Sequence, residues 1–206
     1  MTTTRGLTAF GLVCSLTPSP GPSSSELLAR QVLDALGKHG VTGSLERAVD
    51  HDIKPGVEAD MGEGDAWPAL RERMLAADIF LIATPTWMGH MSSVAQRVLE
   101  RLDAELSDTD HAGRMRTYGK VAVAVVVGNE DGAHKISADL FQGLNDVGFS
   151  LAPGAVTYWN GEAMGKTDYK DLDSTPEQVA TTTASLAANA AHLARLLAAD
   201  PYPPAS

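Results

Sequence analysis

The sequence is poor in cysteine and has no long hydrophobic run. Cys14 is the only cysteine, which excludes an intrachain disulfide and any zinc or iron–sulfur site built from several cysteines. Because Cys14 lies in an apolar segment, it is expected to be a buried thiol that packs as a small hydrophobic residue. The longest aliphatic run, residues 121–127, is far shorter than the roughly 20 residues that span a bilayer. No membrane span is expected.

Basic residues are also scarce, with 16 Lys and Arg against 26 Asp and Glu and a formal charge of −10. Nonspecific binding to a phosphate backbone depends on clustered basic residues, so nucleic acid is not an expected partner. Arg5 precedes the apolar stretch 7–14, as in a secretory signal. That stretch is short, and Val13 is too large for a cleavage site that requires small residues. The protein is therefore expected to be cytoplasmic.

Length and composition predict one globular domain over residues 1–206. The chain is 44% hydrophobic and 20% charged, which is ordinary for a protein with a buried core. The core is expected over about residues 6–199, and the Pro-rich tail 200–206 is expected to fray.

Buried apolar runs alternate along the chain with segments whose apolar residues recur at helical spacing. Strands are predicted over residues 7–14, 41–49, 78–84, 120–127 and 150–158, and helices over residues 23–37 or 23–40, 67–77, 91–106, 133–147 and 175–199. Ser23 with Glu26, and Thr175 with Gln178, have the spacing of a capping box. The alternation predicts a doubly wound, five-stranded parallel sheet with helices on both faces. Ligands bind such a sheet beyond the carboxyl ends of its strands.

The loop over residues 15–25 follows the first predicted strand and contains five serines and one threonine. Hydroxyls beside the free N–H groups of a helix N-terminus suit a phosphate dianion, although serines also serve as plain caps and turn formers. Neither G-x-x-x-x-G-K-[ST] nor G-x-G-x-x-G occurs here. A cysteine phosphatase needs an arginine six residues after Cys14, where Pro20 stands. A receiver domain needs acidic residues at the first and third strand ends, and both are missing.

Two further loops follow predicted strands. In residues 84–92, Pro85 should end the strand and Gly89 permits close backbone approach. Trp87 and Met88 offer a flat apolar surface suited to a conjugated ring, or alternatively to a neighbouring helix or subunit. Residues 128–132 supply backbone N–H groups for a ring edge, although alone they indicate only a turn.

These three loops, in this order, resemble the flavodoxin-like superfamily, specifically its NAD(P)H-dependent FMN reductase and quinone reductase branch. The resemblance is carried by FGLVCSLTPSPGPSSSELL, DIFLIATPTWMGHMSSVAQRVLERLD and KVAVAVVVGNEDGAHKISADLFQGLNDVGF, which cover most of residues 7–158. The second segment is the most specific, because Thr-Pro-x-Trp/Tyr-x-Gly-x-Met-Ser-Ser is the family's flavin-ring loop. The resemblance implies a three-layer α/β/α fold, with sheet order 2-1-3-4-5 and FMN at the switch between the first and third strands.

The resemblance also implies which residues bind FMN. By position they are Ser15, Thr17, Ser23, Ser24 and Ser25 for the phosphate, Pro85, Thr86, Trp87, Met88 and Gly89 for the ribityl chain and ring, and Gly128 and Asn129 for the other side of the ring. The chain departs from many members of this branch in having no basic residue in its phosphate loop. His90, His134 and Trp159 are candidates for contact with substrate, with surface, capping or packing roles as alternatives. No metal site is expected.

The function implied is an oxidoreductase in which NAD(P)H donates hydride to the N5 atom of bound FMN, and a quinone or similar small acceptor then takes the electrons. No catalytic side chain is expected, because the cofactor carries the chemistry. One alternative is a flavodoxin-type electron carrier, suggested by the acidic residues between Asp50 and Asp65, which would steer a basic partner or merely form a solvated loop. Another is an interaction domain without flavin. A homodimer or homotetramer is expected.

Overall fold

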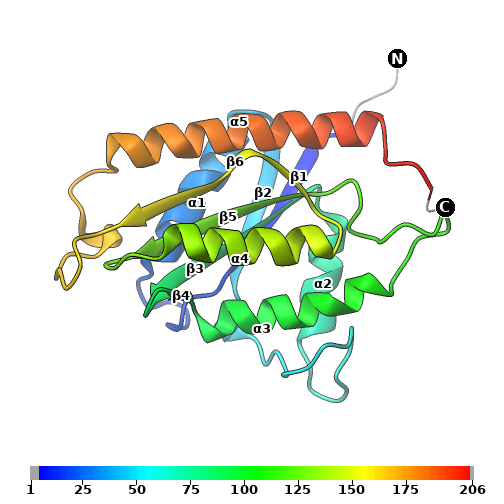
Figure 1. Ribbon diagram of the computed structural model, residues 1–206, viewed down its shortest axis with the longest axis horizontal. Coiled ribbons are helices and arrows are strands. Elements are labelled where there is room, and N and C mark those ends of the chain that lie inside the picture. Colours follow the sequence, from blue (N-terminus) through cyan, green and yellow to red (C-terminus); the bar gives the residue numbers. More distant parts are fainter. Residues whose placement is uncertain (1–4, 205–206) are drawn as a thin grey trace.

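A five-stranded parallel sheet forms the middle layer of the computed structural model, which describes residues 5–204 (Figure 1). The spatial order of its strands is β2-β1-β3-β5-β6. Their bounds are Leu7–Val13 for β1, Val41–Arg47 for β2, Ile79–Trp87 for β3, Val121–Gly128 for β5 and Ser150–Asn160 for β6. Counted along the parallel strands, this is the order 2-1-3-4-5, so the predicted flavodoxin-like fold is confirmed.

Helices cover both faces of the sheet (Figure 1). The helix α1 (Ser24–Gly37) packs with α5 (Glu177–Ala199) on one face. The other face carries α2 (Trp67–Ala76), α3 (Ser93–Leu102) and α4 (Ala133–Asp146). Alternate residues of β5 point to opposite faces, as in any strand, so Val123 and Val125 join the α1–α5 core while Ala124 joins the core on the other side.

The third predicted strand extends past its expected end. Pro85 was expected to stop it, but β3 continues to Trp87 and pairs with a two-residue antiparallel strand, β4 (His90–Met91). Pairing between β3 and β1 ends at Ala83, so the missing N–H of Pro85 removes no hydrogen bond on that side, and proline is tolerated at such a free edge. The predicted ring loop is therefore partly a small hairpin.

Two other predicted boundaries also differ. Ser92, whose Oγ accepts a hydrogen bond from Ala95 N at 3.1 Å, caps α3, so this helix begins at Ser93 and not at residue 91. It is followed by the 3₁₀ turn η2 (Asp103–Leu106). The second strand likewise gives way to the 3₁₀ turn η1 (Ala48–Asp50).

Half of the first predicted capping box forms, and the second does not form. Ser23 Oγ accepts from Glu26 N, whereas the Glu26 carboxylate pairs with Arg47 and Arg30. At α5 the N-cap is Pro176, which has no side-chain cap. Thr175 Oγ1 instead accepts a hydrogen bond from Gln31 of α1 at 2.9 Å.

The tail is anchored at Tyr202, contrary to the expected fraying. The Tyr202 hydroxyl lies 2.9 Å from Ser150 Oγ, its carbonyl accepts from Arg114 at 2.8 Å, and its ring packs edge-on against Tyr118. Residues 205 and 206 lie outside the described part. Over residues 5–204, none of the helices combines the length and the apolar character needed to cross a membrane.

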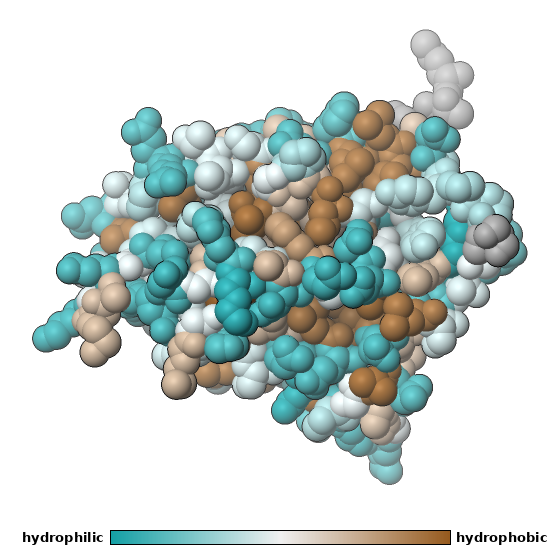
Figure 2. Space-filling model, in the orientation of Figure 1, coloured by the Kyte–Doolittle hydropathy of each residue, from teal (hydrophilic) through white to brown (hydrophobic). Residues whose placement is uncertain are grey.

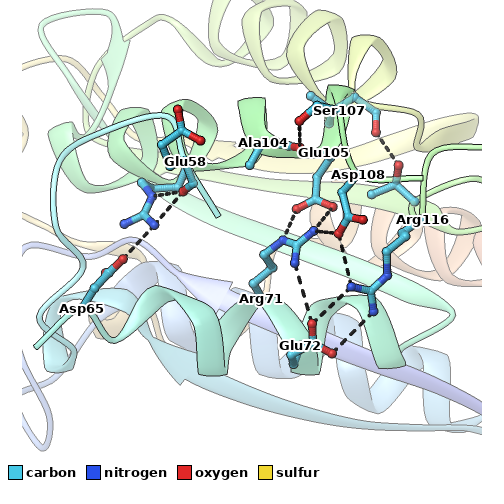
Figure 3. Close-up of polar contacts among 12 residues, drawn as sticks. Glu58, Asp65, Arg71, Glu72, Ala104, Glu105, Ser107, Asp108 and Arg116 are labelled. Atoms are coloured by element: carbon cyan, nitrogen blue, oxygen red, sulfur yellow. Dashed lines mark hydrogen bonds and ion pairs between the residues drawn. The ribbon is translucent and has the colours of Figure 1, made fainter. Parts of the chain in front are cut away.

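An ionic network with a buried centre at Arg71 and Glu105 joins α2 to the turn after α3 (Figure 3). Arg71 donates two hydrogen bonds to Glu105, at 2.6 and 2.9 Å, and pairs with Asp108. Arg116 reaches both Asp108 and Glu72 at 3.3 Å. Burial alone would lower the pKa of Arg71, but its two carboxylate partners raise it well above its usual range. The guanidinium therefore stays charged within the packed layer.

Arg101 organises the acidic loop before α2. Its guanidinium is fully buried and pairs at 2.8 Å with Asp65, which is also fully buried. It donates further hydrogen bonds to the carbonyls of Lys54 at 2.9 Å and Glu58 at 2.8 Å. Asp65 is thus a structural carboxylate and is not part of a solvated acidic surface.

We expect Arg101→Met to lower the free energy of unfolding by about 3–5 kcal/mol, because Asp65 would remain buried without its cation. Burial would raise the pKa of Asp65, but hydrogen bonds from Arg101 and from loop N–H groups lower it well below its usual range. The stabilisation is therefore present above the unfolded-state pKa and is lost as the pH falls through the lower folded-state pKa. Urea unfolding at a series of pH values measures both effects.

Arg97→Met is the matched control on the same helix. The exposed Arg97 side chain donates one hydrogen bond, to Ile53 O at 3.2 Å, so its loss should cost less than about 1 kcal/mol. Equal losses in the two variants would contradict the structural role assigned to the Arg101 pair.

Candidate functional site

The carboxyl ends of β1, β3 and β5 border a cavity of about 420 Å³, within the roughly 300–1,000 Å³ of small-molecule sites. It brings together most of the residues selected from the sequence. Those lining it are Ser15, Thr17, Ser23, Ser24, Ser25, Pro85, Thr86, Trp87, Gly128, Asn129 and Trp159. Met88, Gly89, His90 and His134 are not among the lining residues.

One end of the cavity is formed by the N-terminus of α1. The first N–H groups of a helix have no intrahelical partners and favour an anion, and here serine hydroxyls surround them. The buried Arg47 fixes the preceding loop, because it donates hydrogen bonds to the carbonyls of Thr17 at 3.0 Å and Pro18 at 2.9 Å. Ser15 Oγ accepts from Thr17 N at 3.0 Å. The loop is thus shaped before any ligand binds.

The other end is formed by the ends of β3 and β5. Thr86 is only 4% exposed, and within residues 5–204 its Oγ1 has no hydrogen-bond partner. A Cβ at Gly128 would lie 2.6 Å from Thr86 Cβ, so only glycine allows this close approach. A buried hydroxyl without a partner is costly, and Thr86 is one of the residues that line the cavity.

Two loops meet beside this end. Met88 N donates to the Glu130 carboxylate at 2.7 Å, and a Cβ at Gly132, whose φ is +141°, would lie 2.8 Å from Gly89 Cα. Met88 itself has a φ of +52° and is 88% exposed, because it forms the turn of the β3–β4 hairpin. Met88 and Gly89 therefore shape the rim of the cavity and do not line it.

The two candidate histidines are occupied elsewhere. His90 Nδ1 lies 2.7 Å from Met88 O. His134 Nε2 lies 3.0 Å from the Tyr158 hydroxyl, and the two rings pack edge to face.

Burial raises the pKa of the Cys14 thiol well above its usual range, so Cys14 is a buried, protonated thiol, as expected.

Sequence reasoning missed one wall of the cavity. Met164, Asp168, Tyr169 and Lys170, from the connection between β6 and α5, also line it. Asn129 Nδ2 donates to Asp168 at 2.8 Å, which joins this connection to the end of β5. The segment has no periodicity and no recognisable motif, and it reaches the cavity only through tertiary contacts. The stretch of polar residues after the last strand was the only signal.

These features fit FMN. Hydroxyls and helix N–H groups suit the phosphate ester at the α1 end. At the β3 end, the buried Thr86 hydroxyl has no hydrogen-bond partner within residues 5–204. The side chains of Trp87 and Trp159 supply flat surfaces there for a conjugated ring. No part of the described cavity requires a group of different chemistry.

Two curated proteins resemble most of the chain. It is 36% identical over 201 residues to a divalent metal cation transporter, MntH, from Mycobacterium bovis, covering 94% of the chain but only 29% of that protein. It is 31% identical over 208 residues to 8-demethyl-8-aminoriboflavin-5′-phosphate synthase from Streptomyces davaonensis, covering 95% of the chain and 80% of the synthase.

Among solved structures, RosB with bound 8-demethyl-8-formylriboflavin-5′-phosphate superposes with a TM-score of 0.86 at 30% identity. The match covers 96% of this chain and 82% of RosB. The sequence profile described as NADPH-dependent FMN reductase matches residues 8–163. The chain therefore belongs to the NADPH-dependent FMN reductase family.

Proposed function

We propose that the cavity holds FMN as a bound cofactor and that a quinone or similar small molecule accepts its electrons. The observation that carries this proposal is the continuity of the cavity. It runs from the serines at the N-terminus of α1 to Thr86, whose hydroxyl has no hydrogen-bond partner within residues 5–204. One end suits a phosphate, and the other end suits a polar ring edge. FMN has these two groups at its opposite ends.

Bound FMN supplies a ring that accepts a hydride and passes two electrons to an acceptor. In this proposal the chain's residues bind and orient. Ser15, Ser23 and Ser24 hold the phosphate, and Thr86 donates to a ring or ribityl oxygen. Trp87, which is 54% exposed, borders the open side of the cavity, where NAD(P)H and the acceptor would bind in turn. No side chain is assigned a proton-transfer role.

Thr86→Val should weaken FMN binding roughly 5- to 30-fold, because it removes one hydroxyl while keeping the side chain's shape. The same change should leave the unliganded protein equally stable or more stable, because that hydroxyl is buried without a partner. Thr84→Val is the control. The Thr84 hydroxyl accepts a hydrogen bond from Ser92 N at 3.0 Å, so its loss should destabilise the unliganded protein. FMN titration and thermal unfolding measure the two effects, and unchanged FMN affinity in Thr86→Val would remove the hydroxyl from the site.

A second candidate is an enzyme that chemically alters FMN, as the name of the Streptomyces synthase describes for that protein. The TM-score of 0.86 with RosB favours it, because this similarity extends over nearly the whole chain. The electron-carrier alternative is weaker, because Asp65 is buried against Arg101 and Asp50 accepts a hydrogen bond from Ser19 N at 2.8 Å. Fewer acidic side chains are thus free to steer a partner.

The deciding experiment is turnover of NADH or NADPH by the FMN-loaded protein with a quinone, followed by mass spectrometry of the extracted flavin. Bleaching of the flavin band by NAD(P)H, its recovery on adding quinone, and unchanged FMN would support the reductase. A flavin of altered mass would support the second candidate. Reduction by dithionite but not by NAD(P)H would favour the electron carrier.

We further propose self-association into a homodimer or homotetramer. In Figure 2, hydrophobic residues gather near the C-terminal half of α5, a helix on which Leu196 is 53% exposed. Burying such a patch against a second copy would remove apolar surface from water. The cytoplasmic location remains a prediction.

A further inference from the structure

The phosphate loop contains no Lys or Arg, yet the described cavity is not without a cation. Among the lining residues within 5–204, Lys170 is the only Lys or Arg. We propose that the ammonium group of Lys170 binds the 5′-phosphate of FMN and gives the chain its preference for FMN over riboflavin. This inference rests on the proposed FMN site. It replaces the basic residue expected in the loop after β1 with one from the connection between β6 and α5.

The position of Lys170 is fixed by its neighbours. Tyr169 is 2% exposed, and its hydroxyl donates to Gln31 Oε1 of α1 at 2.6 Å. The Tyr169 ring also packs against Trp159, with 5.6 Å between ring centroids. Lys170 N then donates to Ser24 Oγ at 3.2 Å. The connection is thus anchored beside the N-terminus of α1, where the phosphate is expected.

The contact with Ser24 also orients a donor. A serine hydroxyl can accept one hydrogen bond and donate another. Because Ser24 Oγ accepts from Lys170 N, its own hydrogen remains available for a phosphate oxygen. Lys170 therefore contributes twice: through its backbone, which sets Ser24, and through its side chain.

The side chain is a charged donor with capacity to spare. Lys170 Nζ lies 2.7 Å from a carboxylate oxygen of Asp168 and 2.7 Å from one of Asp171. These carboxylates raise the pKa of Lys170 above its usual value, so the group is an ammonium at neutral pH. An ammonium has three N–H donors, and the two carboxylates use two of them. The third is available for the ligand.

Acidic side chains around the cavity oppose the binding of weakly charged anions. Asp168 and Glu130 line the cavity as well, so a phosphate must overcome their repulsion by contact with a cation and with hydroxyls. Asp171 is 56% exposed at its side chain and can turn to solvent when a phosphate approaches. Without Lys170, the α1 end of the cavity would have serines but no positive side chain to bind the phosphate of FMN. Riboflavin ends in a hydroxyl instead of a phosphate, so its binding would change little.

The test is titration of the flavin-free protein with FMN and, separately, with riboflavin, followed by flavin fluorescence. Lys170→Met should raise the Kd for FMN roughly 10- to 100-fold, the range for a hydrogen bond to a charged group, and leave the Kd for riboflavin unchanged. Lys170→Arg should recover most of the FMN affinity. Lys166→Met is the matched control, because Lys166 is an exposed lysine of the same connection that does not line the cavity.

Thermal unfolding of each variant without flavin checks that the fold is intact. An unchanged Kd for FMN in Lys170→Met, an equal rise for both flavins, or the same loss in Lys166→Met would overturn the role of Lys170. The first of these results would leave FMN binding itself standing. If the wild-type protein binds neither flavin, the proposed function fails together with this inference.

Discussion

The divergence of the chain after β1 and β3 determines where a ligand can bind. The chain leaves β1 toward the face covered by α1 and leaves β3 toward the face covered by α3. Because the chain leaves these two adjacent strand ends toward opposite faces of the sheet, a crevice remains at their carboxyl edge. The residues assigned to the site lie at the ends of strands, at the N-terminus of α1 and in the loops that follow the strands.

The loops around the crevice are held by contacts between segments far apart in sequence. Arg47, at the end of β2, fixes the loop before α1 through two carbonyls. Met88 and Glu130 join the second loop to the third, and Asn129 joins the third to the connection before α5 through Asp168. These contacts hold in place the loops that shape the cavity.

The sequence predicted the strands of the sheet, because an apolar run such as Val121–Gly128 is typical of a strand covered on both faces. The order of the strands was implied by the family resemblance. The sequence also indicated the hydroxyl end of the cavity, since serines beside a helix N-terminus suit an anion as well as serving as caps. The course of β3 past Pro85 was not predictable, because it depends on where β1 stops pairing. Tyr169 and Lys170 were missed for a related reason. Their place is set by contacts with Gln31 and Ser24, which no local pattern encodes.

The proposed site is a single cavity that binds FMN with its phosphate at the N-terminus of α1 and its ring beside Thr86. A crystal structure of the protein grown with FMN tests it most directly. We expect the phosphate within hydrogen-bond distance of the Ser23 or Ser24 hydroxyl and of Lys170 Nζ, with the ring next to Trp87. Flavin bound at another surface, or bound here with its phosphate directed toward Trp87, would contradict it.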